Sequence, residues 1–254
     1  MMRHVLSTLL MLSAVATADD ADPYREPALR ELMAAVTFYV SFDEGLQPDL
    51  AAGKAYAPKI HGNYAKTRKQ PEFVDGLLGR ALVLGTGSAV YPTAGNAPFE
   101  SRGAAAFWIK PLEWKSDKDG TSVFVLAGRH LIVERQGPQS GPDGRVRRHA
   151  GILCIGRGEK IQGRASTIMA PDLKNGEWYF IAVNWSWPRI EMSINGAAPH
   201  AKSTAGRPLA DAFPRFNVGA RGGSRALMDE LLIFKRPLTP AEVRRLYRAL
   251  RPAL

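Results

Sequence analysis

Two adjacent acidic residues, Asp229 and Glu230, are the first candidates for chemistry, because they stand inside the apolar segment Ala226–Phe234. Glycoside hydrolysis uses two carboxyl groups about 5 to 10 Å apart, on either side of the bond that breaks. Neighbouring residues of a strand point to opposite faces, so this spacing predicts that Asp229 and Glu230 do not act as a pair. The pattern Glu-x-Asp-x-x-Glu, whose first two carboxylates share one strand face, does not occur.

Histidine and cysteine offer no further catalytic group. The sequence contains neither His-x-x-x-His nor His-Glu-x-x-His, the spacings that bind zinc on a helix. The single cysteine, Cys154, lies in the apolar run Gly151–Ile155, which predicts a buried and unreactive thiol. With no complete catalytic constellation, the sequence predicts a protein that is not an enzyme.

Three tryptophans are candidates for ligand binding. Trp114, Trp185 and Trp187 lie at or near the ends of predicted strands, where an exposed indole can stack on the face of a sugar ring. The alternative, in which each indole packs onto its own hairpin, stays open. Trp108 and Trp178 lie within strand-like segments, and we expect both in the core.

Short apolar segments separated by turn residues dominate the chain. The run Val36–Phe42 is β-branched and aromatic, which is typical of a strand, and Asn195-Gly196 predicts a tight hairpin turn. Further strands are expected at Arg80–Leu84, Ser88–Tyr91, Ala104–Lys110, Ser122–Ala127, Leu131–Arg135, His149–Ile155, Trp178–Trp185, Arg189–Ile194, Arg215–Val218 and Ala226–Phe234. So many strands with little helical periodicity between them favour an all-β sandwich.

The two ends of the chain differ from its middle. Residues 1–18 have a basic start, about a dozen apolar residues and a small-x-small exit, which predicts a Sec-type signal peptide and a secreted or periplasmic protein. That run is too short to span a membrane. Residues 19–35 form an extension with a short helix expected over Pro27–Ala35, and one domain follows over 36–254. Thr239 and Glu242 form a capping box that predicts a helix over Pro240–Leu250.

The charge balance favours acidic partners. Lys and Arg number 34 against 24 Asp and Glu, and the net charge is +10. The basic residues are spread along the chain, with the densest groups in polar, turn-rich stretches, so we expect no nucleic-acid partner.

Five motifs in order resemble the laminin-G-like, concanavalin A-like jelly-roll family. They are Val40–Gly45, Gly79–Leu82, Ala106–Pro111, Gly176–Val183 with Ile194-Asn195-Gly196, and the closing signature Leu227–Val243. The resemblance implies an all-β, two-sheet antiparallel jelly-roll sandwich with a short C-terminal helix. It does not fix the function, because domains of this fold bind glycans, proteins or steroids, or accompany an enzyme.

The combined expectation is an exported, non-catalytic binding module for a polysaccharide or another extracellular ligand. A glycoside hydrolase or polysaccharide lyase of the same fold is the main alternative. A structural or adhesive protein that binds a protein partner is the third interpretation.

The resemblance also implies a metal site. In many jelly rolls the first and last strands are neighbours, which would bring Asp43 and Glu44 close to Asp229. Calcium prefers several carboxylate and carbonyl oxygens. We therefore expect a structural calcium bound by Asp43 and Asp229, with Glu44 as a helper. A turn-capping Asp43 with a solvated Glu44 is the alternative.

Overall fold

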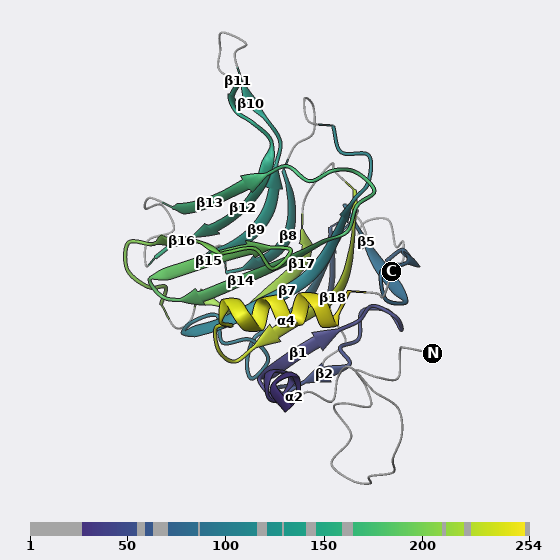
Figure 1. Ribbon diagram of the computed structural model, residues 1–254, viewed down its shortest axis with the longest axis vertical. Coiled ribbons are helices and arrows are strands. Elements are labelled where there is room, and N and C mark those ends of the chain that lie inside the picture. The colour runs from purple at the N-terminus through teal and green to yellow at the C-terminus, as the bar shows by residue number, and fades with distance from the viewer. Residues whose placement is uncertain are drawn as a thin grey trace.

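The protein is a sandwich of two antiparallel β-sheets, as the computed structural model describes it for residues 27–54, 59–62, 71–85, 87–115, 121–128, 130–140, 146–158, 165–209, 212–220 and 225–251 (Figure 1). The predicted all-β jelly-roll class with a short C-terminal helix is confirmed. The predicted signal peptide lies outside the described residues. Within them, no helix has the length and apolar character needed to cross a membrane.

The first sheet is the larger. Its main path runs β16 (His200–Ser203), β15 (Arg189–Ile194), β14 (Tyr179–Ser186), β7 (Arg102–Pro111), β18 (Ala226–Phe234), β1 (Val36–Val40) and β2 (Leu50–Ala51). Strand β5 (Arg80–Leu84) pairs with the first part of β18 and with β4 (Phe73–Asp75). Strand β18 is therefore shared by β1 on its later part and by β5 on its earlier part.

The second sheet lies opposite the first. Its order is β13 (Ser166–Pro171), β12 (Gly151–Gly156), β9 (Leu131–Gln136), β8 (Ser122–Ala127), β17 (Arg215–Ala220), β6 (Gly87–Pro92) and β3 (Lys59–Gly62). A two-stranded ribbon of β10 (Gln139–Ser140) and β11 (Val146–Arg148) projects from one end of the sandwich (Figure 1).

Alternation along the strands builds the core between the sheets. On β12, Ile152 and Cys154 belong to the central cluster, whereas Leu153 and Ile155 belong to a separate cluster. Burial raises the pKa of the Cys154 thiol to about 12, which keeps it protonated and inert. Rings of Phe38 and Phe216 meet edge to face at 5.2 Å in the same core.

Two helices lie against the first sheet. Helix α4 (Pro240–Ala249) packs Val243 and Leu246 onto the outer face of that sheet, and α2 (Pro27–Met33) lies beside β1 and β2 (Figure 1). The Thr239 side chain accepts the Glu242 backbone N–H, and the Glu242 carboxylate accepts the Thr239 N–H, so the predicted capping box is present.

Candidate functional site

An open groove lies at the end of the sandwich where β1 begins and β18 ends. Its volume is about 670 Å³, within the range of small-molecule pockets. The connection between β6 and β7 forms one wall, and the segment before β17 forms another. The groove, called the end groove below, is lined by Thr37, Thr93, Ala94, Gly95, Ala97, Pro98, Glu100, Phe213, Pro214 and Lys235.

The lining of the end groove combines apolar surface with two charged groups. Phe213 is buried, and the prolines and alanines of the lining offer a ligand C–H contacts. Glu100 and Lys235 are exposed, and neither side chain has an ion pair or hydrogen bond within the described part of the chain. A carboxylate accepts and an ammonium donates hydrogen bonds, so each can bind a hydroxyl group of a ligand.

Two of the predicted tryptophans hold the wall of the end groove. The Trp185 indole is fully buried and its Nε1–H donates to the Pro98 carbonyl at 3.0 Å. The Trp187 Nε1–H donates to the Phe99 carbonyl at 2.7 Å, and its ring stacks on Phe213. Trp185 thus has no exposed face for a sugar, whereas the partly buried Trp187 keeps some exposure.

Trp114 lies elsewhere and is also buried. Its Nε1–H donates to the Arg225 carbonyl at 2.7 Å, near the beginning of β18, and the Arg135 guanidinium lies 4.7 Å from its ring centre. The Arg135 side chain is itself buried and binds both oxygens of Asp172. Trp114 therefore fixes the end of the sandwich opposite the end groove, and the exposed indole on which its predicted role depends is not present.

The predicted metal residues lie where β1 and β18 meet. The two strands are hydrogen-bonded neighbours, as the calcium prediction required. The Asp43 Oδ1 atom accepts the Arg80 N–H at 2.7 Å. The Asp229 Oδ2 atom accepts the Leu77 and Leu78 N–H groups at 2.8 and 3.0 Å. The two carboxylates thus bind backbone N–H groups at the first residue of β5 and in the loop that precedes it.

A β-bulge corrects the expectation that Asp229 and Glu230 face opposite ways. The register of β18 against β7 shifts between Asp229 and Leu232, and Glu230 has a φ of 53°. A bulge adds one residue and re-aims the side chains near it. Both carboxyl groups are therefore buried on the outer side of the first sheet, where the Glu230 Oε2 atom accepts the Tyr39 hydroxyl at 2.8 Å.

Burial determines the protonation of these carboxyl groups. Burial raises the pKa of Asp229 to about 7, against the lowering effect of its backbone N–H bonds. Burial, and then the Asp229 charge, raise the pKa of Glu230 well above its usual value. The Asp229 Oδ1 atom is buried without a hydrogen-bond partner. A proton or a cation at this oxygen would relieve the cost of burying the charge.

Calcium fits this arrangement only in part. The orphaned Asp229 oxygen favours a cation, and Asp43 lies close enough for its charge to raise the pKa of Asp229. Glu44 is exposed. Among the described residues, no group of three or more His, Cys, Asp or Glu side chains is arranged to hold a metal ion. Since calcium takes about six to eight oxygen ligands, the calcium site stays a prediction.

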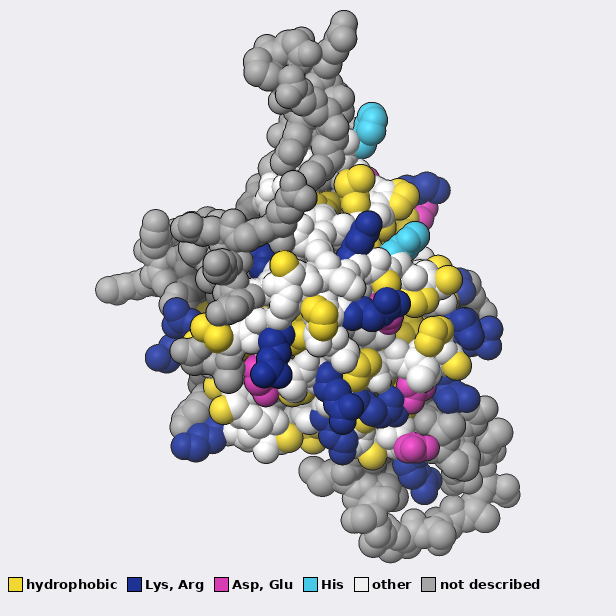
Figure 2. All heavy atoms as spheres, turned by 90° about the vertical axis from the view of Figure 1, so that its left-hand side faces the viewer, with side chains coloured by type: hydrophobic (Ala, Val, Ile, Leu, Met, Phe, Trp, Pro, Cys, Tyr) yellow, Lys and Arg dark blue, Asp and Glu magenta, His cyan; other side chains and the backbone are white. Residues whose placement is uncertain are grey.

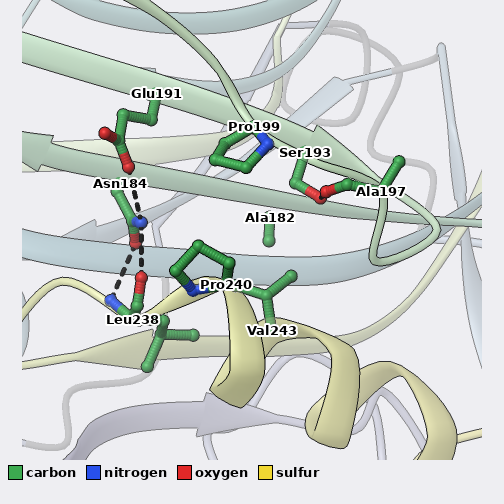
Figure 3. A pocket seen from close by; sticks show the side chains of 9 residues that line it. All are labelled: Ala182, Asn184, Glu191, Ser193, Ala197, Pro199, Leu238, Pro240 and Val243. Carbon is green, nitrogen blue, oxygen red and sulfur yellow. Dashed lines mark hydrogen bonds between the residues drawn. The ribbon is translucent and has the colours of Figure 1, made fainter.

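A small cavity between β14, β15 and α4 is structural (Figure 3). Its volume of about 10 Å³ holds one water molecule at most. The Asn184 side chain donates to the Leu238 carbonyl and accepts its N–H, at 2.8 and 2.9 Å, and also donates to Glu191 at 3.2 Å (Figure 3). These bonds hold the connection that leads from β18 into α4.

Sequence reasoning missed the residues that line the end groove. Thr37, Glu100, Phe213 and Lys235 are far apart in the chain and share no motif. The one available signal was that Lys235 directly follows β18 in the closing signature.

Comparison with known families gives one match. A model of the concanavalin A-like lectin/glucanases superfamily, of the laminin-G type, matches residues 84–244, more than half of the chain. No curated protein matches the sequence significantly.

Similar solved structures include binding domains. Domain 4 of AbnA, a GH43 extracellular arabinanase from Geobacillus stearothermophilus, in complex with arabinotriose, is 21% identical, with a TM-score of 0.58 over 84% of this chain and 98% of that one. The botulinum neurotoxin DC binding domain in complex with SialylT is 10% identical, with a TM-score of 0.63 over 85% and 51%. The same domain in complex with rat synaptotagmin II is 9% identical, with a TM-score of 0.63 over 86% and 52%.

The chain spans about half the length of the neurotoxin domains that it resembles. At such low identities, the likeness to all three structures shows the fold alone.

Proposed function

The chain belongs to the concanavalin A-like lectin/glucanases superfamily, and from that premise we propose that it is an exported, non-catalytic module that binds an extracellular glycan in the end groove. The observation that carries the proposal is the groove itself. It offers apolar surface together with the Glu100 carboxylate and the Lys235 ammonium group, and two tryptophan N–H bonds hold one of its walls. Sugars present this combination of C–H faces and hydroxyl groups.

The fold supports a binding role. One similar structure carries arabinotriose and another carries SialylT, and both are described as domains of larger proteins. The predicted signal peptide and the net charge of +10 favour an extracellular partner, including acidic ones.

The number and the burial of the carboxylates favour a binding function over hydrolysis. Glu100 is the one carboxylate among the described residues that line the end groove, and a glycosidase places two across the bond that breaks. The other paired carboxyl groups, Asp229 and Glu230, are 0% and 3% exposed, so a substrate has no access to them.

A glycan array followed by calorimetry tests this proposal. We expect the protein to retain one class of oligosaccharide and to release no shortened product on prolonged incubation. Lys235→Met and Glu100→Gln should each weaken binding about tenfold, because each removes a charge-assisted hydrogen bond. Product release that one carboxylate substitution abolishes would favour the hydrolase or lyase. An empty array with capture of one exported protein would favour the adhesive role, for which the neurotoxin domain bound to synaptotagmin is the structural parallel.

A further inference from the structure

The exposed side of α4 carries a row of arginines. Val243, Leu246 and Leu250 are buried against the first sheet, whereas Arg244, Arg248 and Arg251 are exposed. Arg244 and Arg248, four residues apart, lie along one face of α4, and Arg251 follows just after the helix ends at Ala249. These three residues are called the arginine stripe below.

The stripe has no acidic partner on its own helix. Residues 243–251 contain neither Asp nor Glu. The acidic residue of the first turn, Glu242, binds Arg236 with both carboxylate oxygens, at 2.6 and 3.0 Å. Like charges four residues apart destabilise a helix, and an anion bound between Arg244 and Arg248 would relieve that repulsion. The uncompensated charge therefore favours an external anion over simple solvation.

Contacts with neighbouring residues hold part of the arginine stripe in place. A Cβ at Gly196 would lie 3.3 Å from the Cα and Cγ atoms of Arg244, so the hairpin turn between β15 and β16 packs against this side-chain stem. The Arg251 guanidinium lies 5.9 Å from the ring centre of Tyr247. Side chains that are already ordered lose less conformational entropy when they bind a ligand.

The wider surface is basic as well. On the side of the molecule that carries β15, β16 and one end of α4, Lys and Arg side chains outnumber acidic ones, and several gather in the lower half of the view (Figure 2). The positive potential of this surface adds to that of the stripe and would attract a polyanion from a distance.

We propose that the arginine stripe binds a linear acidic polysaccharide. A guanidinium group forms two parallel hydrogen bonds with a carboxylate or sulfate, and a straight row of such groups matches a linear chain of anions. A helix that binds in a membrane surface inserts its apolar face, and the apolar face of α4 is packed on the sheet. The polysaccharide is therefore the favoured partner, and the site is independent of the end groove.

Binding to polygalacturonate, with uncharged dextran and vesicles containing phosphatidylglycerol as comparisons, tests the proposal. The stripe variant is Arg244→Gln/Arg248→Gln/Arg251→Gln. A matched variant, Lys202→Gln/Arg207→Gln/Arg215→Gln, removes the same charge at exposed positions outside α4, which separates the stripe from the wider basic surface. Arg248→Gln alone serves as a milder second variant, and circular dichroism verifies that each variant is folded.

We expect wild-type protein to bind polygalacturonate but not dextran, with an affinity that falls as salt rises. The affinity for polygalacturonate should fall about tenfold or more in the stripe variant, severalfold in Arg248→Gln and less than threefold in the matched variant. Equal losses in the stripe and matched variants would reduce the effect to net charge and overturn the proposal. Vesicle binding without polygalacturonate binding would overturn it in favour of a membrane. Loss of binding in Lys235→Met with the stripe variant unaffected would place the anion in the end groove instead.

Discussion

Asp229 is the residue whose carboxylate charge is hardest to reconcile with its buried position. Its Oδ2 atom accepts two backbone N–H groups, while its Oδ1 atom is buried without a partner. The pKa of about 7 reflects burial that outweighs those two bonds. In the folded protein this carboxyl group therefore binds a proton over a pH range in which the unfolded chain has released it.

Asp229→Asn should remove a pH dependence that wild-type protein shows in a chelator. Because the folded pKa is about 7 and the unfolded value is 3.8, wild-type stability should fall as pH rises between these values. The free energy of unfolding of the variant, relative to wild type, should rise over that range by at most about 4 kcal/mol. Urea unfolding at pH 4 and pH 8 measures this difference. If the free energy of unfolding fell equally in both proteins as pH rises, Asp229 would not be the group with the raised pKa.

The same variant tests the predicted calcium site. If calcium binds Asp43 and Asp229, added calcium should raise the melting temperature of wild type and leave Asp229→Asn unchanged, because an ion that binds only the folded state stabilises it. Glu44→Gln, at an exposed position, should respond like wild type if Glu44 is solvated and more weakly if it is a ligand. A wild-type midpoint that neither calcium nor chelator moves would rule the site out.

Trp187 should support ligand binding without being the main contact. Trp187→Phe removes the bond to the Phe99 carbonyl and should cost about 1 kcal/mol of stability or somewhat more, with a severalfold loss of glycan affinity as the groove wall loosens. Trp114→Phe loses an equivalent bond, to the Arg225 carbonyl, at the opposite end of β18. It should cost similar stability and leave affinity intact, so equal affinity losses would contradict the groove assignment.

At the scale of elements, regular patterns were predictable and irregular ones were not. Strands β5, β8, β15 and β18 begin and end at the predicted residues. Strands β5, β8 and β18 are mostly apolar runs bounded by turn or polar residues, whereas β15 alternates polar and apolar residues before the Asn195-Gly196 turn. Strands β13 and β16 were missed. They lie at the sheet edges and expose several side chains, so their sequences lack the continuous apolar run of a buried strand. The bulge at Glu230 was missed because nothing in an apolar run marks where one extra residue enters.

The capping box of α4 should lose its contribution to stability at low pH. The Arg236 hydrogen bonds lower the pKa of Glu242 to about 2 from its usual 4.5, so its contribution is complete above pH 4.5 and is lost as pH falls through 2. Glu242→Gln should cost about 1 kcal/mol at pH 7, and the difference from wild type should vanish near pH 2. Chemical denaturation at both pH values measures this. Glu72→Gln, at the exposed pair with Arg225, is the control and should change little.

At the scale of the molecule, the fold could be predicted because five motifs follow one another in the family's order. The end groove could not, because its lining comes from segments that only folding brings together, Thr37 at the start of β1, Glu100 and Phe213 in two connections, and Lys235 after β18. The tryptophans were identified correctly as residues near strand ends. Their indole N–H groups point to backbone carbonyls, however, and this direction cannot be deduced from strand position.

Amide chemical-shift mapping by nuclear magnetic resonance, with the oligosaccharide that the array selects, is the most direct test of whether a glycan binds in the end groove without being cleaved. We expect the shifts to cluster at residues 93–100, 213–214 and 235, around the end groove, with unchanged sugar signals throughout the titration. Shifts confined to another surface, such as the exposed face of α4 or the second sheet, or new sugar signals from a cleaved product, would contradict a non-catalytic glycan site in the end groove.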